Sequence, residues 1–396
     1  EGKYTLLNAR PLRTIYVNKN WNDDNKHIIR PLKITFDLYR NGKLYRTAEM
    51  EAGQFRQTSQ SLFTDLYAYD EYGVYYQYEV RERKVAGYKS LGNQTVSGGT
   101  GNTIVYFSNT RQGILDITKK VVGGDTKKRF TFHIHLEQAD GALYNPADQD
   151  GNAAAFTVRR YAKDTQGNDT AYTDESVTMA EAGLLNVGVA DGEKVRILDL
   201  PKGIHYKVTE ETEKYTSVLT GDTEGTIGSY NAPAASVTCT NTVQPVSLSI
   251  PVEKKITGEP VPEGEEKEFT FTLEGKADES IQTQTPSAQA QLPMPSDAQD
   301  GKCQLKITGA GKGSFGEIQY TSAGTYEYTV KEEAGSEKGY TYDEHVYRVK
   351  VVVTDNKGQL EASMTVNDQT ATQVTVTNEY HPQAATVTIP VEKKIT

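Results

Sequence analysis

The sequence predicts an all-β chain divided into several small domains, and three observations support this. The chain has 396 residues, whereas one domain usually has about 100–200. Hydrophobic residues make up only 36% of it, even with 25 tyrosines counted, which indicates thin cores. The abundance of Tyr, Val and Thr favours half-buried strands over disorder. We therefore expect more than one core, each built from strands.

The charge distribution excludes two classes of partner. The formal net charge is −10, and the 43 Lys and Arg residues form no basic run, so nucleic-acid binding is not expected. No apolar stretch approaches the roughly 20 residues needed to cross a bilayer, and the first residues do not form a signal peptide. If the protein is secreted, we expect its targeting and anchoring signals outside this segment.

A strand-like segment that ends in lysine recurs along the chain. The eight residues IPVEKKIT at 250–257 appear again at 389–396. Looser relatives occur at Leu115–Val121 and Ile15–Trp21, and each places a Lys after alternating apolar residues. Such self-similarity indicates repeated domains.

Two further elements recur with the same order and similar spacing. One is a strand-like run that ends in Asn, and the other is a Tyr-x-Val-x-Glu run in the interior of each repeat. The first type occurs at Val105–Asn109, Val237–Asn241 and Val374–Asn378, with Tyr4–Asn8 as a fourth, and the second at Tyr78–Glu82, Tyr206–Glu210 and Tyr328–Glu332.

Strand geometry predicts where these polar side chains point. Residues two apart in a strand lie on one face, and Lys19 shares its face with Ile15 and Val17. The same alternation applies to the other repeats. Each domain thus directs three polar side chains inward: Lys19, Glu82 and Asn109; Lys119, Glu210 and Asn241; and Lys254, Glu332 and Asn378. The choice of Lys119 over Lys120 and of Lys254 over Lys255 depends on this alternation, which a β-bulge would reverse.

A buried Lys, Glu and Asn together can form an amide bond. Unpaired buried charges cost several kcal/mol, but burial also disfavours the lysine ammonium and leaves a nucleophilic amine. A buried, neutral carboxyl can polarise the Asn carbonyl and move protons. The amine then replaces ammonia, helped by proximity within the core. The alternative is that Lys and Glu are ordinary solvated or salt-bridged side chains and that Asn-Thr is a turn.

The residues around these clusters resemble two known families. The run Val17–Asp24, taken with Tyr78–Glu82 and Phe107–Thr110, resembles the B-type repeat domain of Gram-positive collagen adhesins. The second and third repeats resemble the isopeptide-linkage domains of streptococcal-type backbone pilins. In the third repeat the resemblance extends through Phe269–Leu273, Pro293–Pro295, Ser314–Ile318 and Gly324–Val330; the second is more divergent around residues 140–190.

The resemblance implies tandem immunoglobulin-like (Cna B-type) β-sandwiches in an extended array. It implies Lys-Asn isopeptide bonds between first and last strands: Lys19–Asn109 promoted by Glu82, Lys119–Asn241 by Glu210, and Lys254–Asn378 by Glu332. The expected domains are residues 12–111, 112–244 and 245–381. Residues 1–11 are expected to hold the last strand of a preceding repeat and a linker, and residues 382–396 a linker and the first strand of a following repeat.

The expected function is that of a structural stalk segment of an adhesin or pilus on a bacterial cell surface, anchored to the cell wall through a signal outside this segment. It is not expected to be an enzyme with turnover. Two alternatives remain: a backbone pilin polymerised by sortase, whose Tyr-Pro-Lys-Asn-type motif we do not find, and an adhesin module that binds a host glycan or matrix protein through the second domain. Expected partners are further repeats of the same parent chain and sortase-linked pilus subunits.

Other motifs favour ordinary structural roles, and we expect no cofactor or metal. His133 and His135 are predicted on the solvated face of a strand. The run Asp148–Asn152 lacks the distal Glu of a calcium loop and is read as a turn. Two cysteines, Cys239 and Cys303, are too few for a disulfide scaffold; the pair Cys303-Gln304 resembles an adhesin thioester only faintly. The polar stretch 280–300 is predicted to be a long surface hairpin connection.

Overall fold

A computed structural model describes residues 10–23, 30–55, 58–90, 92–96, 98–147, 151–163, 169–228, 234–275, 292–384 and 387–394. These residues form an all-β protein, as predicted, and they contain no α-helix. Within this part of the chain, no helix is long and apolar enough to span a membrane. The chain separates into two compact units. The first unit contains the first sandwich and most of the second, and the second unit contains the third sandwich together with residues 121–126, 212–217 and the end of the second sandwich's last strand from Thr240.

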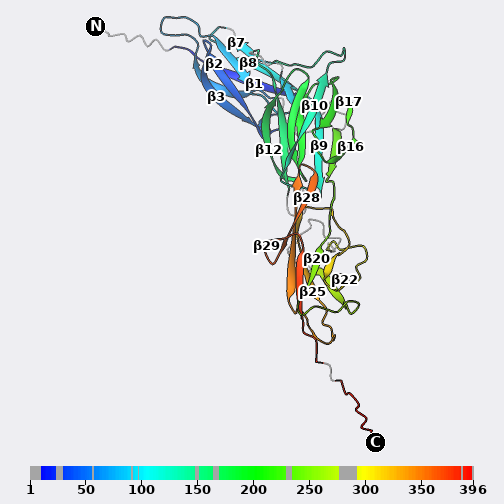
Figure 1. Cartoon of the computed structure of the whole chain (residues 1–396). Helices are drawn as coiled ribbons and strands as arrows, with labels where there is room; N and C mark the ends of the chain where they lie inside the picture. The colour runs from blue at the N-terminus through cyan, green and yellow to red at the C-terminus, as the bar shows by residue number, and fades with distance from the viewer. Residues whose placement is uncertain are drawn as a thin grey trace, which may run out of the picture. The chain divides into compact units, whose positions relative to one another are not determined.

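The first sandwich places its first and last strands side by side. Its two four-stranded sheets have the orders β4-β1-β8-β6 and β3-β2-β5-β7, and β1 and β8 run parallel (Figure 1). The buried faces of both sheets share one hydrophobic core. The strands are β1 (Leu12–Asn22), β2 (Lys33–Arg40), β3 (Lys43–Glu51), β4 (Gln60–Tyr67), β5 (Tyr78–Glu82), β6 (Tyr88–Ser90), β7 (Gln94–Val96) and β8 (Thr103–Arg111).

The second sandwich also pairs its first strand with its last. One sheet has the order β13-β10-β15-β17 and the other β12-β11-β14-β9-β18-β16. The divergent region around residues 140–190 includes the β11–β12 hairpin. The strands are β9 (Gly113–Val122), β10 (Arg129–Glu137), β11 (Ala155–Lys163), β12 (Asp169–Thr178), β13 (Leu184–Ala190), β14 (Lys194–Leu200), β15 (His205–Glu210), β16 (Thr216–Gly221), β17 (Glu224–Thr226) and β18 (Ala235–Thr242).

The third sandwich repeats the parallel pairing between its first long strand, β20, and its last strand, β30. Its sheets have the orders β23-β20-β30-β26 and β22-β21-β25-β27-β28-β29, with a short β19-β24 pair. The strands are β19 (Val246–Leu248), β20 (Pro251–Gly258), β21 (Glu268–Gly275), β22 (Lys302–Thr308), β23 (Gly311–Ser314), β24 (Ile318–Tyr320), β25 (Gly324–Glu332), β26 (Tyr340–Thr341), β27 (Val346–Asn356), β28 (Gln359–Val366), β29 (Gln369–Thr370) and β30 (Val374–Tyr380).

Several minor expectations can be placed on this fold. On β10, Phe130 and Phe132 are buried and His135 is exposed, as the alternation predicts. The polar stretch 280–300 connects the antiparallel strands β21 and β22, but residues 280–291 lie outside the described part, as do 148–150 of the predicted turn.

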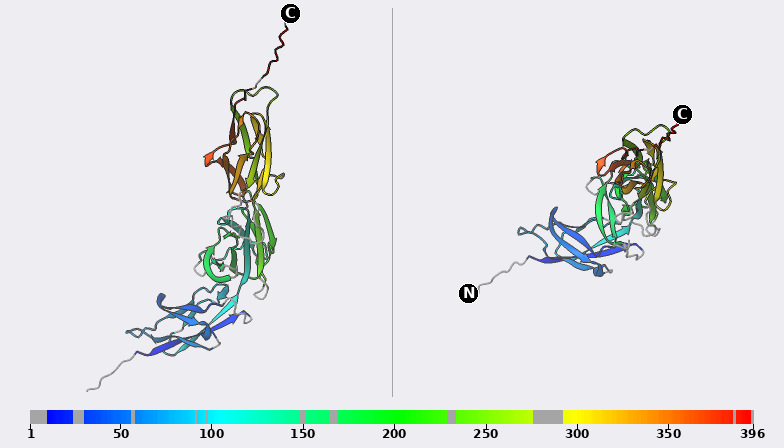
Figure 2. Two further views of the ribbon diagram at one scale, coloured as in Figure 1. Left: turned by 90° about the horizontal axis from the view of Figure 1, so that it is seen from below. Right: turned by 60° about the horizontal axis from the view of Figure 1, so that its bottom comes forward.

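The two predicted partial repeats at the ends stay predictions. Residues 387–394 are exposed and form no strand, and in Figure 2 the red trace that contains them runs away from the strands of the third sandwich. Residues 1–9, with the strand predicted at 4–8, and residues 395–396 lie outside the described residues.

Candidate functional sites

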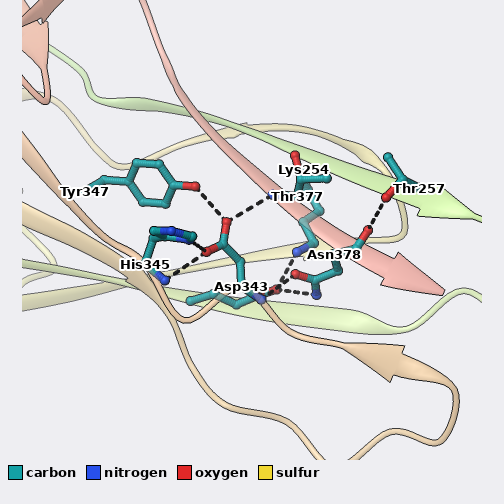
Figure 3. A network of polar contacts seen from close by, with 8 residues as sticks. Lys254, Thr257, Asp343, His345, Tyr347, Thr377 and Asn378 are labelled. Atoms are coloured by element: carbon teal, nitrogen blue, oxygen red, sulfur yellow. Dashed lines mark hydrogen bonds and ion pairs between the residues drawn. The ribbon is translucent and has the colours of Figure 1, made fainter.

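The third sandwich brings Lys254, Glu332 and Asn378 together in its core. They come from β20, β25 and β30 respectively. The Lys254 Nζ lies 2.7 Å from Glu332 Oε1, and the Asn378 Nδ2 donates to the same oxygen at 3.0 Å. Both the Lys254 and Glu332 side chains are fully buried, and so is Asn378. Figure 3 shows the lysine amine and the Asn378 amide directed toward one another.

The first sandwich contains the same arrangement. Lys19 on β1 places its Nζ 2.7 Å from Glu82 Oε1 on β5. Asn109 on β8 donates its Nδ2 to that same oxygen at 3.1 Å. In both sandwiches, one carboxylate oxygen is thus shared between a lysine amine and an asparagine amide.

The second sandwich differs in one neighbour. Lys119 Nζ lies 2.7 Å from Glu210 Oε1, and both side chains are fully buried. The Cys239 thiol donates to Glu210 Oε2 at 3.2 Å and accepts from Lys119 Nζ at 3.3 Å. Asn241 is also buried and follows Cys239 by two positions on β18.

Strand register explains why these groups meet. In the parallel β1–β8 pair, Lys19 is opposite Phe107 and Asn109 lies two residues beyond it. In the β20–β30 pair, Lys254 is opposite Val376 and Asn378 again lies two residues beyond. Since residues two apart share a face, the Lys and Asn side chains emerge as diagonal neighbours on the inner face of one sheet. The Glu reaches them from the facing sheet.

The surroundings of each lysine are apolar. Lys254 Nζ lies 4.6 Å from the ring centre of Phe269, Lys119 Nζ 4.3 Å from that of Phe130, and Lys19 Nζ 4.8 Å from that of Trp21. Burial lowers the pKa of Lys19 to about 8, although Glu82 opposes this shift. Burial likewise lowers the pKa of Lys254 against the effect of Glu332. These lysines are therefore closer to the neutral, nucleophilic form than exposed lysines are.

The outer carboxylate oxygen of each Glu has a donor that sequence reasoning missed. Ser90 Oγ donates to Glu82 Oε2 at 2.9 Å, and Cys239 supplies the equivalent donor to Glu210. In the third site the backbone N–H of Asp343 lies 3.3 Å from Glu332 Oε2. The three donors are a hydroxyl, a thiol and a backbone amide, so no shared residue type marks this role in the sequence.

Three family models match successive parts of the chain. Residues 15–106 match the Cna protein B-type domain, and residues 250–381 match the Spy0128-like isopeptide containing domain. Two separate parts of the chain therefore resemble these two domain families. Residues 113–243, between them, match a domain of unknown function, DUF7601. A comparison with curated proteins finds no match.

Solved structures of surface proteins are among those that resemble the chain. Two B repeat units of the collagen binding protein of Staphylococcus aureus are 19% identical, with 94% of this chain and 76% of that chain covered and a TM-score of 0.21. The major pilin from Streptococcus pyogenes is 17% identical, with 59% and 98% covered and a TM-score of 0.23. The pilus-presented adhesin Spy0125 is 14% identical, with 42% and 36% covered and a TM-score of 0.23; this chain thus spans about a third of that adhesin.

Proposed function

We propose that this chain is a structural stalk segment of a bacterial surface adhesin or pilus, and that each of its sandwiches is closed by a self-formed Lys-Asn isopeptide bond. The observation that carries the proposal is the shared carboxylate oxygen. Glu82 Oε1 and Glu332 Oε1 each contact a buried lysine amine and an asparagine amide at once. The proposed bonds are Lys19–Asn109, Lys119–Asn241 and Lys254–Asn378, promoted by Glu82, Glu210 and Glu332.

The reaction exchanges one amine for another on the Asn side chain. The lysine Nζ attacks the amide carbon, a new C–N bond forms, and the original amide nitrogen leaves as ammonia. The Glu carboxyl takes the proton from the attacking amine and delivers a proton to the departing nitrogen, which is general acid–base catalysis by one positioned group. Each site reacts once, because its nucleophile and its electrophile are both consumed.

The position of the bond suits a mechanical role. It links the strand that enters a sandwich to the strand that leaves it, β1 to β8 and β20 to β30. Tension that enters through one strand would pass to the other through a covalent link, so the intervening strands would carry little of it. Domain families named for a surface collagen-binding protein and for a pilin support a structural role over an enzymatic one.

We propose further that the protein lies outside the cell, anchored to the cell wall; its Cna B-type and Spy0128-like domains support the extracellular location. The Spy0128-like domain supports assembly with further pilin-like repeats, either within one parent chain or through subunits linked by sortase.

The decisive experiment is the intact mass of the purified full chain. Three amide-forming condensations predict a mass below that of the plain sequence by three ammonia molecules, about 17 Da each. Proteolysis should release three branched peptides that join the predicted Lys and Asn. In each of the variants Lys19→Ala, Lys119→Ala and Lys254→Ala, the mass deficit relative to the variant's own sequence should be smaller by one ammonia. A wild-type mass equal to that of the sequence would overturn the proposal.

A further inference from the structure

The carbonyl of Asn378 has a specific hydrogen-bond donor. The backbone N–H of Asp343 donates to Asn378 Oδ1 at 2.9 Å, and the same N–H lies 3.3 Å from Glu332 Oε2. In Figure 3, Asp343 lies beside the asparagine, next to the amide group that lies near Lys254. One N–H thus faces both the electrophile and the carboxyl of the third site.

The side chain of Asp343 fixes the position of this N–H. Its carboxylate accepts from the backbone N–H of His345 at 2.9 Å and from Tyr347 Oη at 2.7 Å. It accepts in addition from the backbone N–H of Thr377 at 3.3 Å, and His345 Nδ1 lies 2.7 Å from it (Figure 3). The short segment after β26 is therefore tied to β27 and β30 through one carboxylate.

The carboxylate of Asp343 is ionised near neutral pH. Burial raises the pKa of Asp343, but the hydrogen bonds from Tyr347 and His345 outweigh burial and leave the pKa below its ordinary value. The ionised Asp343 carboxylate is therefore present at every pH at which the amine of Lys254 has begun to lose its proton. The carboxylate of Asp343 therefore stays a hydrogen-bond acceptor across the pH range in which the bond would form.

Charge development on Asn378 gives this N–H a function. When Lys254 Nζ attacks the amide carbon, the carbonyl π electrons move to Oδ1, and the oxygen becomes negative. A donor already aimed at that oxygen stabilises the charge without reorganisation, as in an oxyanion hole. The electron pair then returns to the carbon as the protonated amide nitrogen leaves as ammonia.

We propose that the backbone N–H of Asp343 is the oxyanion donor of the third site and that the Asp343 carboxylate is the positioning group that holds it there. This inference rests on the proposed isopeptide bond between Lys254 and Asn378. It adds a fourth residue to the site and assigns a catalytic part to the segment that follows β26.

The first sandwich uses the equivalent strand differently. There β6 pairs with β8 and places Ser90 opposite Asn109, much as β26 pairs with β30. The donor it supplies is the Ser90 hydroxyl, which is directed at Glu82. Changes at Asp343 should therefore leave the first bond untouched, which makes that bond an internal control in the same molecules.

The test follows bond formation in the full chain as it folds. Chain that has never folded, recovered from inclusion bodies in urea, is diluted to start folding, and samples are quenched in acid and digested. The branched peptides that join Lys254 to Asn378 and Lys19 to Asn109 are then quantified against time. Asp343→Pro removes the N–H, Asp343→Ala releases the anchor but keeps the N–H, and Asp343→Asn keeps the N–H and one acceptor oxygen.

The variants should separate catalysis from folding. Loss of one oxyanion donor slows a reaction by about 10²–10³, so Asp343→Pro should form the third bond more slowly by this factor. Asp343→Ala should be intermediate, and Asp343→Asn should recover much of the wild-type rate. The rate of the first bond should stay the same in every variant.

Hydrogen exchange of the β20 and β30 amides reports whether the third sandwich has folded. If Asp343→Pro fails to fold, two milder variants replace it: Asp343→Ala, and Tyr347→Phe, which removes a single hydrogen bond to the Asp343 carboxylate. Both should slow formation of the third bond in folded protein. A folded Asp343→Pro or Asp343→Ala protein that reacts at the wild-type rate would overturn this inference alone. Absence of the branched peptide from the wild-type protein would instead overturn the isopeptide proposal itself.

Discussion

In the proposed reaction, Glu332 would transfer the protons of the third site. Its Oε1 contacts both the amine of Lys254 and the amide nitrogen of Asn378, so one atom can accept the proton of the nucleophile and pass a proton to the leaving group. An amide in the same place would keep the shape and the hydrogen bonds but could not exchange protons. Both proton transfers of the proposed reaction would therefore depend on one carboxyl.

Replacing that carboxyl tests this directly. Glu332→Gln should abolish the third bond and raise the intact mass by about 17 Da, the mass of one retained ammonia, because the amine loses its general base. Intact-mass measurement provides the readout. Glu333→Gln is the matched control, since Glu333 is the next residue and its carboxylate accepts a hydrogen bond from Thr272 Oγ1 outside the site. An unchanged mass in Glu332→Gln would show that another group moves the protons.

If the first site forms the proposed bond, its lysine should set the pH dependence of the reaction. Attack requires the neutral amine, and burial lowers the pKa of Lys19 to about 8. Below that pH the rate of Lys19–Asn109 bond formation in folded protein should rise about tenfold per pH unit, and above it the rate should level off. This profile is measured by quantifying the branched peptide in folding reactions between pH 6 and pH 10, roughly two units either side of the lowered pKa. A rate that keeps rising toward the ordinary lysine value of 10.5 would contradict it.

At the scale of elements, alternation in the sequence was enough to direct the right side chains inward. Period-2 patterns place Lys19 and Asn109 with apolar neighbours, and the structure buries both. The repetition of three similar segments also predicted more than one sandwich. These features depend on neighbours two positions away, which a single sequence displays.

The donors around each carboxyl could not be predicted in this way. Asp343 reaches the third site because β26 pairs with β30, and Ser90 reaches the first because β6 pairs with β8. Such contacts depend on which strands become neighbours and in which register. No local pattern encodes that pairing, and the loops involved differ between the sandwiches.

Strand linkage should limit how far a sandwich can be stretched. Lys19 and Asn109 are 90 positions apart, and an extended chain spans about 3.3–3.6 Å per residue. The variant Asn109→Ala should therefore show an additional extension of roughly 300 Å when the first sandwich unfolds under force. Single-molecule pulling from the two ends of the chain measures this length. The wild-type protein should lack this step, and its appearance there would mean that β1 and β8 are not joined.

At the scale of the whole molecule, the bonds should stabilise each sandwich separately. Closure of loops of 90 to 124 positions lowers the entropy of the unfolded chain by an amount worth about 4–5 kcal/mol, by analogy with disulfides. The variants Asn109→Ala and Asn378→Ala should each lower the free energy of unfolding of one sandwich. Because the two sites lie in different compact units, the effects should add in the double variant.

Urea unfolding followed by hydrogen exchange assigns each loss to its sandwich. The first sandwich should be unaffected in Asn378→Ala, and the third should be unaffected in Asn109→Ala. A single variant that destabilised both units equally would show that the sandwiches do not unfold independently.

Because Lys254 and Asn378 are completely buried, the proposed bond can form only after the domain has folded. The amine and the amide meet only where β20, β25 and β30 have packed, so an unfolded chain has no means of joining them. In the proposed reaction ammonia would escape into the surrounding solvent, so the step would not be reversed. A cross-linked peptide would thus show that its domain had once reached the native state. It could still be detected after the chain had been denatured, digested or stored.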